Sequence, residues 1–423
     1  MEPITVAASR DRFERAGRPF FYLADTVWSA FTNATIEEWR EYLSCRSAQG
    51  FNALQINILP QWDRSRGEEP FEPFARKGKR GWDFTAPNGQ YFEHTKAMAE
   101  MAVERGFVPA LVLLWCDYVP GTWGAERVPG HAITHGELEP YVQHVAETFR
   151  ELQPIFLVSG DTRFTGPESL AAYRRALSLI KRHAPESLTT FHLTPDAELP
   201  EELVQAEELD FTMYQSGHHV EQQDRPYRLA EYFTGLEVKR PVVNGEPCYE
   251  GMGHYKRGGR FSHYHVRKAV WQSLLSGAKA GVTYGAHGLW SWHREGITFE
   301  GVETWDLPYP WSTALRLPGA WDAAFARWIF ETFELFDLDA CDAIENEWPE
   351  IRAAASPDGG KLAAYVPSAT ELRLRIDLAG CDCSLIDLGG RRVLRPVLRA
   401  WDGGTAVDVP MINGDYVFLA LRR

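Results

Sequence analysis

Residues 241–250 read Pro241-Val-Val-Asn-Gly-Glu-Pro-Cys-Tyr-Glu250, a short β-branched run that leads to a carboxylate at Glu246. A Val-rich run of this kind predicts a buried parallel strand, and the Asn-Gly-Glu-Pro that follows predicts its exit loop. Glu246 therefore falls at the C-terminal end of a strand. In a (β/α)8 barrel this edge carries the chemistry, so the next question is whether seven similar strands exist.

Similar apolar runs recur along the chain and alternate with amphipathic helical patterns. Thr35 and Glu38 form a capping box that begins one such helix, and Gly50 ends it. The expected strands cover residues 18–25, 51–59, 107–115, 155–161, 188–193, 210–215, 241–246 and 281–285. This alternation predicts an α/β fold, a (β/α)8 TIM barrel.

Beyond about residue 337 the pattern changes to short alternating runs, separated by turn signals such as Pro357-Asp-Gly-Gly360. These runs predict a small antiparallel β-sandwich after the barrel. We therefore expect a barrel catalytic domain over residues 1–336 and a C-terminal β-sandwich domain over 337–423. The sandwich is expected to pack against the barrel, with glycan binding as its alternative role.

The composition is that of a globular protein rich in aromatic residues. Hydrophobic residues make up 44%, charged residues 24% and aromatic residues 13%, with 15 Trp. Rings that line a cleft stack on sugar faces, which favours a carbohydrate ligand. The net charge of −14 argues against a nucleic-acid partner, because phosphate binding needs clustered Lys and Arg.

The amino-acid sequence shows no pattern typical of a targeting signal. Residues 1–21 lack the basic region and apolar stretch of a signal peptide, and no window reaches about 18 apolar residues. We therefore expect a cytoplasmic protein without a membrane partner. The pattern leaves the oligomeric state open.

Two carboxylates stand where a barrel enzyme would need them. Asp161 and Glu246 end the fourth and seventh expected strands, each after a glycine that we expect to let the backbone kink. These two strand ends face each other across the mouth of a barrel. Glycoside hydrolysis needs such a pair, one acid that protonates the leaving oxygen and one carboxylate that attacks the anomeric carbon. The sequence predicts Asp161 as acid/base and Glu246 as nucleophile of a retaining glycosidase.

The sequence resembles the apiosidase-like glycoside hydrolases nearly end to end, a family in which a barrel is joined to a C-terminal β-sandwich. The most specific matching motifs are Val158-Ser-Gly-Asp161, Gln215-Ser-Gly-His218 and Asn244-Gly-Glu-Pro-Cys-Tyr-Glu250. The resemblance implies a retaining mechanism with the same two roles on Asp161 and Glu246. It also implies a carbohydrate substrate, a plant-derived glycan or glycoside.

Two departures from the family pattern leave the sugar open. Where the family usually has Gly-Gly-Asp-Arg after the fourth strand, this chain has Ser159-Gly-Asp-Thr162. The family's His-Pro after the fifth strand is replaced by His192-Leu-Thr-Pro195. Both changes fall on edges expected to contact substrate.

Polar and aromatic side chains at the strand exits are expected to bind the substrate, because polar groups pair with sugar hydroxyls and indoles stack on sugar rings. The alternative for each Trp is packing between barrel and helices, and for each His a structural hydrogen bond. The expected substrate-binding residues are Asp25, Trp28, Asn57, Trp115, Asp117, His192, Tyr214, Gln215, His218, Tyr284, Trp290 and Trp292.

Long aromatic-rich loops follow the second and third strands and are expected to be lids or binding loops. Trp62 and Asp63 lie in the first loop and Trp123 in the second. Two such loops could close one end of the cleft, which favours exo action on a chain end.

No metal or cofactor is expected, because the sequence has no His-Glu-x-x-His motif, no Gly-x-Ser-x-Gly elbow and no Gly-x-Gly-x-x-Gly after a strand. Two other functions stay open at this point. One is a non-catalytic carbohydrate-binding barrel with the same aromatic cleft. The other is a metal-dependent hydrolase on the same scaffold.

Overall fold

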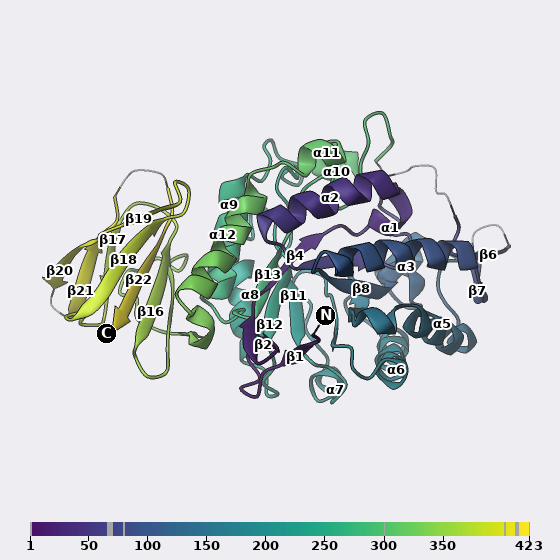
Figure 1. Ribbon diagram of the computed structural model, residues 1–423, viewed down its shortest axis with the longest axis horizontal. Helices are drawn as coiled ribbons and strands as arrows, with labels where there is room; N and C mark the ends of the chain where they lie inside the picture. The colour runs from purple at the N-terminus through teal and green to yellow at the C-terminus, as the bar shows by residue number, and fades with distance from the viewer. Residues whose placement is uncertain are drawn as a thin grey trace.

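The computed structural model describes residues 2–65, 71–78, 81–299, 301–401, 403–410 and 414–422. Its larger part is an eight-stranded parallel sheet wrapped into a barrel and surrounded by helices (Figure 1). Around the barrel the strands follow the order β10-β9-β8-β5-β4-β13-β12-β11. In chain order they are β4 (Tyr22–Thr26), β5 (Ala53–Asn57), β8 (Val108–Trp115), β9 (Ile155–Gly160), β10 (Thr189–Thr190), β11 (Thr212–Gln215), β12 (Val242–Glu246) and β13 (Gly281–Tyr284).

The seam between β10 and β11 is closed by single hydrogen bonds. The Asp210 N–H donates to the Thr189 carbonyl at 3.1 Å, and the Thr190 hydroxyl donates to the Phe211 carbonyl at 2.8 Å. The predicted (β/α)8 barrel is therefore confirmed. Because the strands are parallel, their C-terminal ends, including the end of β12 at Glu246, meet at one edge.

The helices that cover the barrel begin and end on local signals. Thr35 and Glu38 make both bonds of the capping box that begins α2, and Gly50 ends that helix in the left-handed conformation. The longer helices are α2 (Ile36–Gln49), α3 (Gly89–Glu104), α5 (His135–Phe149), α6 (Pro167–His183), α8 (Arg225–Thr234), α9 (His263–Leu274) and α12 (Gly319–Thr332). Short helical turns are α1 (Ala30–Asn33), η1 (Cys116–Tyr118), α4 (Trp123–Arg127), η2 (Arg150–Leu152), α7 (Glu201–Val204), α10 (Val302–Trp305), α11 (Trp311–Ala314) and η3 (Leu335–Asp337).

Two segments differ from the sequence-based expectation. The first expected strand divides at Phe21: β3 (Arg18–Phe20) joins β1 (Ile4–Val6) and β2 (Phe13–Arg15) in a small antiparallel sheet, and only β4 enters the barrel. The long loop after β5 contains a hairpin of β6 (Phe74–Lys77) and β7 (Gly81–Pro87).

The C-terminal part is the expected antiparallel sandwich. One sheet has the order β14-β15-β16-β22-β18-β19 and the other the order β17-β21-β20. Their strands are β14 (Asp339–Ala340), β15 (Arg352–Ala355), β16 (Lys361–Val366), β17 (Glu371–Leu374), β18 (Cys381–Asp387), β19 (Arg392–Leu394), β20 (Val397–Trp401), β21 (Gly404–Asp408) and β22 (Tyr416–Arg422).

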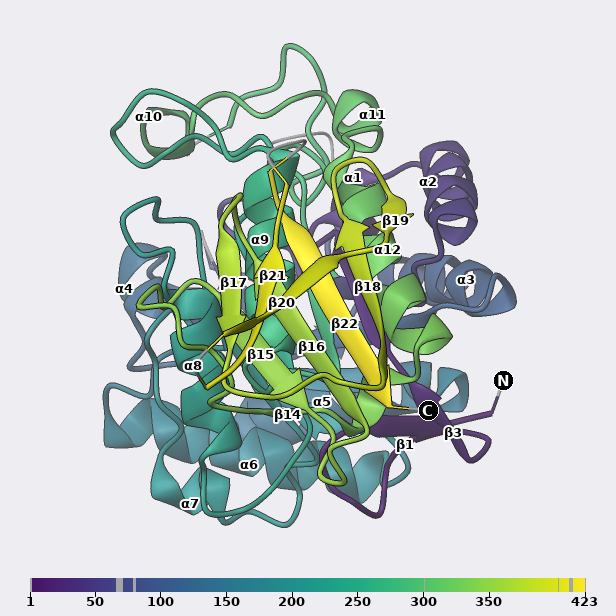
Figure 2. The ribbon, with the colours of Figure 1, turned by 90° about the vertical axis from the view of Figure 1, so that its left-hand side faces the viewer.

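The larger sheet of the sandwich is buried on both faces. Along β16, Ala363 and Tyr365 join the core of the barrel, whereas Leu362, Ala364 and Val366 join the core of the sandwich. This alternation is the two-residue period of a strand. Seen from the sandwich side, its strands lie in front of α9 and α12 (Figure 2). The sandwich thus packs directly on the barrel.

A buried arginine also joins the two parts. Arg267 on α9 is only 3% exposed, and its guanidinium donates to Asp415 at 2.6 Å and to Asp322 on α12 at 2.8 Å. The Tyr365 hydroxyl donates to the same Asp415 at 3.1 Å. Arg267 therefore neutralises one carboxylate from each side of the interface.

None of the helices in the described ranges combines the length and the apolar character needed to cross a bilayer.

Replacing Arg267 with Met is expected to destabilise the protein by about 3–5 kcal/mol, because buried Asp415 loses its cation and Asp322 loses one ion-pair partner while keeping Arg391. Urea denaturation of the whole chain would measure this as a lower midpoint. Arg375→Ala is the matched control: Arg375 pairs with Asp342 and Glu345 at the surface, and its removal should leave the midpoint unchanged. Equal midpoints for the Arg267 variant and the control would contradict the interface role.

Candidate active site

The carboxyl ends of the barrel strands open into a cavity of about 400 Å³. Asp161 and Glu246 both line it. The space is large enough for a small ligand, and its wall combines aromatic rings with polar and charged side chains, as is usual for ligand sites.

Glu246 is buried, and its carboxylate meets three donors from neighbouring strand exits. His218 Nε2 lies 2.8 Å from Oε1, and the Gln215 side-chain amide donates to the same oxygen. His192 Nε2 makes a longer polar contact of 3.3 Å to Oε2. β10, β11 and β12 thus converge on one carboxylate.

Backbone amides determine the tautomers of both histidines. The Asp161 N–H donates to His192 Nδ1 at 3.2 Å, and the Tyr249 N–H donates to His218 Nδ1 at 3.3 Å. A ring nitrogen that accepts a hydrogen bond carries no proton, so each ring presents Nε2–H to Glu246.

These donors keep Glu246 ionised. Burial alone would raise the pKa of its carboxyl, but the His192 and His218 groups directed at it outweigh burial and hold that pKa well below its usual range. A carboxylate that is charged and oriented at neutral pH is suited to nucleophilic attack.

Asp161 has the opposite environment. Burial, followed by the nearby charges of Glu246 and Asp63, raises the pKa of the Asp161 carboxyl well above its usual range. A carboxyl group kept protonated in this way can give a proton to a leaving group. The cavity therefore holds one carboxyl group whose surroundings favour the protonated form and one whose surroundings favour the ionised form.

The backbone of Asp161 is held in an uncommon conformation. Its φ is +52°, in the left-handed region that non-glycine residues seldom adopt. The Trp123 indole donates to the Asp161 carbonyl at 2.9 Å, and the Asp161 N–H is held by His192. Strain that neighbours hold in place is characteristic of functional sites.

The glycines before the two carboxylates leave room for neighbouring side chains that pack against the backbone. We expected them to let the backbone kink: neither Gly160 nor Gly245 has a positive φ, but the pairing of β12 with β11 shifts by one residue at Gly245. A Cβ at Gly160 would overlap the ring of Trp115, and one at Gly245 would overlap Met213. The close approach of these side chains is what requires glycine.

Asp63 adds a third carboxylate to the cavity. Asn57 donates to Gln61 at 2.7 Å, and Gln61 donates to Asp63 at 2.6 Å, which forms a chain from the end of β5 to the cavity. Burial, together with the charges of Asp117 and Glu246, raises the pKa of Asp63 to about 6.

Aromatic rings form the walls. Trp28 lies edge-on to Trp115 with ring centroids 5.3 Å apart, and its indole donates to the Tyr249 hydroxyl at 2.9 Å. Trp62 and Trp123, from the two long loops, meet edge-on at 6.0 Å. Flat, rigid walls of this kind match the faces of sugar rings.

A family model described as the catalytic domain of apiosidase-like proteins matches residues 8–337. The chain belongs to the apiosidase-like family. The protein is accordingly a glycoside hydrolase, and its substrate is a carbohydrate. No curated protein sequence matches the chain.

Solved structures share the fold of this apiosidase-like protein. A structure described as a glycoside hydrolase superposes with a TM-score of 0.81 at 19% identity and covers 100% of this chain and 97% of the other. A glycoside hydrolase family 5 protein from Bacteroides vulgatus has the same TM-score and identity, with coverages of 99% and 93%. A family 5 mannosidase from Rhizomucor miehei reaches a TM-score of 0.52 at 12% identity, with coverages of 78% and 99%. At these identities the likeness concerns the fold.

Most of the sequence-predicted site residues of the apiosidase-like barrel come together. Those that line the cavity are Trp28, Trp115, Asp161, Gln215, His218, Glu246 and Trp290. His192 does not line it but contacts Glu246, and Asn57 donates a hydrogen bond to Gln61.

Three predicted residues point away from the cavity, towards the outer helices. Asp25 pairs with Arg46 of α2 at 2.6 Å. The Tyr214 hydroxyl donates to the Pro226 carbonyl on α8, at 2.7 Å. The Tyr284 hydroxyl donates to Glu250 at 2.7 Å, beside the start of α12. Successive strand residues face opposite sides of the barrel wall, and these three face outward.

Two further predicted residues also lie outside the lining. Trp292 stacks on Trp311 at 5.2 Å and donates to Glu38, which anchors the start of α2. Asp117 is fully buried against His131 at 3.1 Å, and its charge contributes to the raised pKa of the cavity residue Asp63.

Loop residues supply the parts of the site that were not predicted individually. Trp62, Asp63 and Trp123 come from the two loops that the sequence marked as binding loops, but their positions could not be placed from pattern. Others lie on irregular segments after the strands or on the short helical turns α4 and α10. The additional lining side chains include Gln61, Arg127, Arg163, Thr194, Pro195, His219, Tyr249, Met252, Phe299, Thr304 and Trp305.

Replacing His218 with Ala is expected to move the acid limb of the pH–activity profile to higher pH. The loss of a donor raises the pKa of Glu246, so the carboxylate becomes protonated at a higher pH than in the unaltered protein. The profile of kcat/KM between low and neutral pH would show this shift. Tyr284→Phe, which removes a bond to Glu250 only, should leave the limb in place, and an unmoved limb in the His218 variant would contradict this account.

Proposed function

We propose that this glycoside hydrolase acts by double displacement with retention, Glu246 being the nucleophile and Asp161 the acid/base. The observation that carries the proposal is the opposite pKa shift of two carboxyl groups in one cavity: Glu246 is held ionised and Asp161 is held protonated. Environments that separate the two pKa values in this way assign the two roles.

In the first half of the reaction, Glu246 attacks the anomeric carbon while Asp161 protonates the departing glycosidic oxygen. A glycosyl ester forms on Glu246, and the aglycone leaves with the proton. In the second half, the ionised Asp161 removes a proton from water, which attacks the anomeric carbon and releases Glu246 as a carboxylate. Asp161 ends protonated, as it began.

The remaining groups of the cavity support this sequence of steps. The N–H groups of His192 and His218 orient the Glu246 carboxylate and disperse its charge. Asp63, with one oxygen held by Gln61, is placed to accept hydrogen bonds from sugar hydroxyls. The aromatic walls provide stacking surfaces for sugar rings.

For the substrate we propose a plant-derived glycan or glycoside, cleaved from a chain end. The loops that carry Trp62 and Trp123 meet over one side of the cavity, which favours a site that is closed at one end. The departures at Thr162 and Leu193 lie next to the cavity residues Arg163 and Thr194, so we expect them to influence which sugar is accepted.

A mechanism-based label should identify the nucleophile. An aryl glycoside that the protein turns over would first be found by screening, and its 2-deoxy-2-fluoro analogue would then be incubated with the enzyme. We expect a stable glycosyl-enzyme, detected by intact mass, on the peptide that contains Glu246. Glu246→Gln should bind sugar but form no adduct. Product of inverted configuration by NMR would overturn the retaining mechanism.

Asp161→Asn is expected to slow hydrolysis of glycosides with poor leaving groups by about 10²–10⁴-fold, because general acid catalysis is lost. In the unaltered enzyme, activity should fall as pH rises through the raised pKa of Asp161, since the active form is protonated. The variant should lose this basic limb.

Substrates with activated leaving groups provide the internal control for Asp161. Cleavage of their bond needs little protonation, so the first step should be much less affected in Asp161→Asn, and added azide should speed the second step. Equal losses for good and poor leaving groups would contradict the acid role.

A further inference from the structure

The outer face of α12 carries a strip of exposed aromatic side chains. Trp321 and Trp328 are 46% and 48% exposed, and in the described part of the chain they are the only tryptophans among the exposed large hydrophobic residues. They are seven residues apart and therefore lie on one face, two turns apart. Half-buried Phe325 lies between them and stacks on Trp328, with centroids 5.4 Å apart and planes 11° from parallel.

The two tryptophans are not needed for the packing of the helix, whereas Phe325 also packs in part against the core of the barrel. The opposite face of the helix is already buried by Ala320, Ala323, Ala326, Ile329 and Phe330. An exposed indole lacks the stabilisation that burial of its apolar surface would give. Two exposed indoles on the same face of one helix therefore indicate a binding surface. We call Trp321, Phe325 and Trp328 the aromatic strip.

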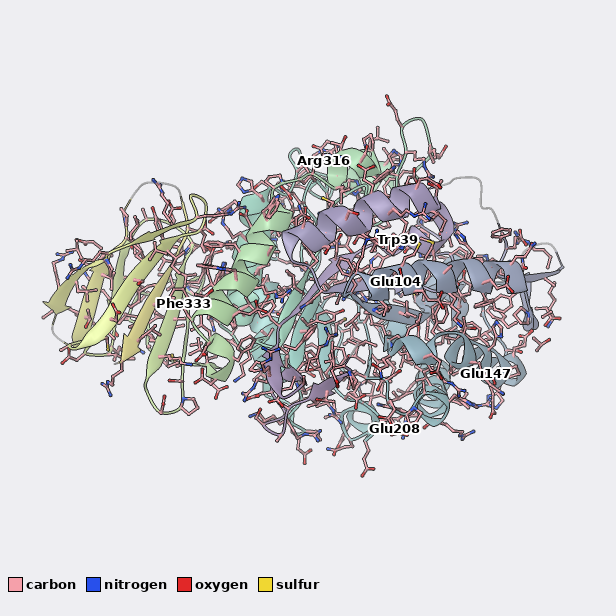
Figure 3. All side chains as sticks on the ribbon, viewed as in Figure 1. Trp39, Glu104, Glu147, Glu208, Arg316 and Phe333 are labelled. Carbon is pink, nitrogen blue, oxygen red and sulfur yellow. The ribbon has the colours of Figure 1, made fainter. Side chains whose placement is uncertain are left out.

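The aromatic strip begins at the catalytic end of the barrel. The Gly319 N–H, in the first turn of α12, donates to Glu250 at 2.8 Å, and Glu250 lies four residues after Glu246. From there the strip runs about 10 Å down the side of the barrel. Phe333, labelled in Figure 3, marks the far end of the helix, beside the sandwich. No residue of the strip lines the cavity.

The size of the aromatic strip decides between possible occupants. An aromatic side chain can bury about 150–250 Å², so half-exposed rings offer roughly 100 Å² each. Three such rings fall well short of the roughly 800 Å² per partner of a stable protein interface. A flat, narrow ligand fits better than a second copy of the chain.

The surroundings match a sugar chain. Arg327, next to Trp328 in the sequence, pairs with Glu331 on the same helix at 2.8 Å, and both side chains are partly exposed. A pyranose or furanose presents an apolar face for stacking and a rim of hydroxyls for such charged groups. We propose that the aromatic strip is a surface site for a glycan chain, which holds a polysaccharide beside the mouth of the cavity. The proposal rests on the carbohydrate substrate of the enzyme and not on the roles of Asp161 and Glu246.

The test is native electrophoresis of the whole chain in gels that contain polygalacturonate, arabinogalactan, arabinoxylan or galactomannan. We expect at least one of these to retard the protein, and Trp321→Ala/Trp328→Ala to weaken that retardation by roughly tenfold in affinity. Val397→Ala/Leu398→Ala, which removes exposed apolar side chains from β20, is the matched control and should bind as the unaltered protein does. Trp321→Phe/Trp328→Phe should retain much of the binding.

Measuring the turnover of a small aryl glycoside distinguishes a failure of this proposal from a failure of the proposed function. The Trp-to-Ala variant should keep kcat/KM on that substrate, which also shows that it is folded, and lose efficiency on the retarding polysaccharide. Retardation that depends on the aromatic strip would stand even if no glycoside were hydrolysed. Absence of retardation by all four polymers would overturn the proposal. Sedimentation would also overturn the proposal if the unaltered protein formed a concentration-dependent dimer and the Trp-to-Ala variant did not. The aromatic strip would then be a contact with a second copy of the chain.

Discussion

The buried charge of Glu246 is the constraint on which the site depends. An ionised carboxylate inside a barrel is costly unless donors surround it, and here they come from the ends of separate strands. His192 follows β10, Gln215 ends β11 and His218 follows it. Closing the barrel brings these segments side by side, so the charge state of one residue depends on the register of three neighbouring strands.

The same arrangement makes Asp161 different from Glu246. No hydrogen-bond donor is directed at the Asp161 carboxyl in the described structure, and the charges of Glu246 and Asp63, which raise its pKa, outweigh that of Arg163, which lowers it. His192 links the two groups, because its Nδ1 accepts from the Asp161 backbone while its Nε2 faces Glu246. A shift of the His192 ring would therefore disturb both carboxyl groups together, which couples the strained backbone of Asp161 to the charge of Glu246.

Buried polar contacts also join the outside of the barrel to the layers around it. Arg46 with Asp25, Tyr284 with Glu250 and Arg267 with Asp415 are buried contacts that tie strands or helices to the next layer. Their groups face helices or the sandwich and not the cavity. Buried carboxylates thus serve two purposes in this protein, joining the layers of the structure and lining the cavity. The purpose of each depends on whether it projects outward from the barrel or into the cavity.

The sequence by itself determined the number and order of the barrel strands, the ends of α2 and the two carboxylates at strand ends, because residue period, caps and glycine positions are local signals. It could not determine that Asp25, Tyr214 and Tyr284 face outward, since a shift of one residue in a strand reverses the side to which each side chain points. It also could not place Asp63 in the cavity or give the histidines their tautomers. Those features depend on contacts between segments far apart in the chain, and only the closed barrel brings these segments together.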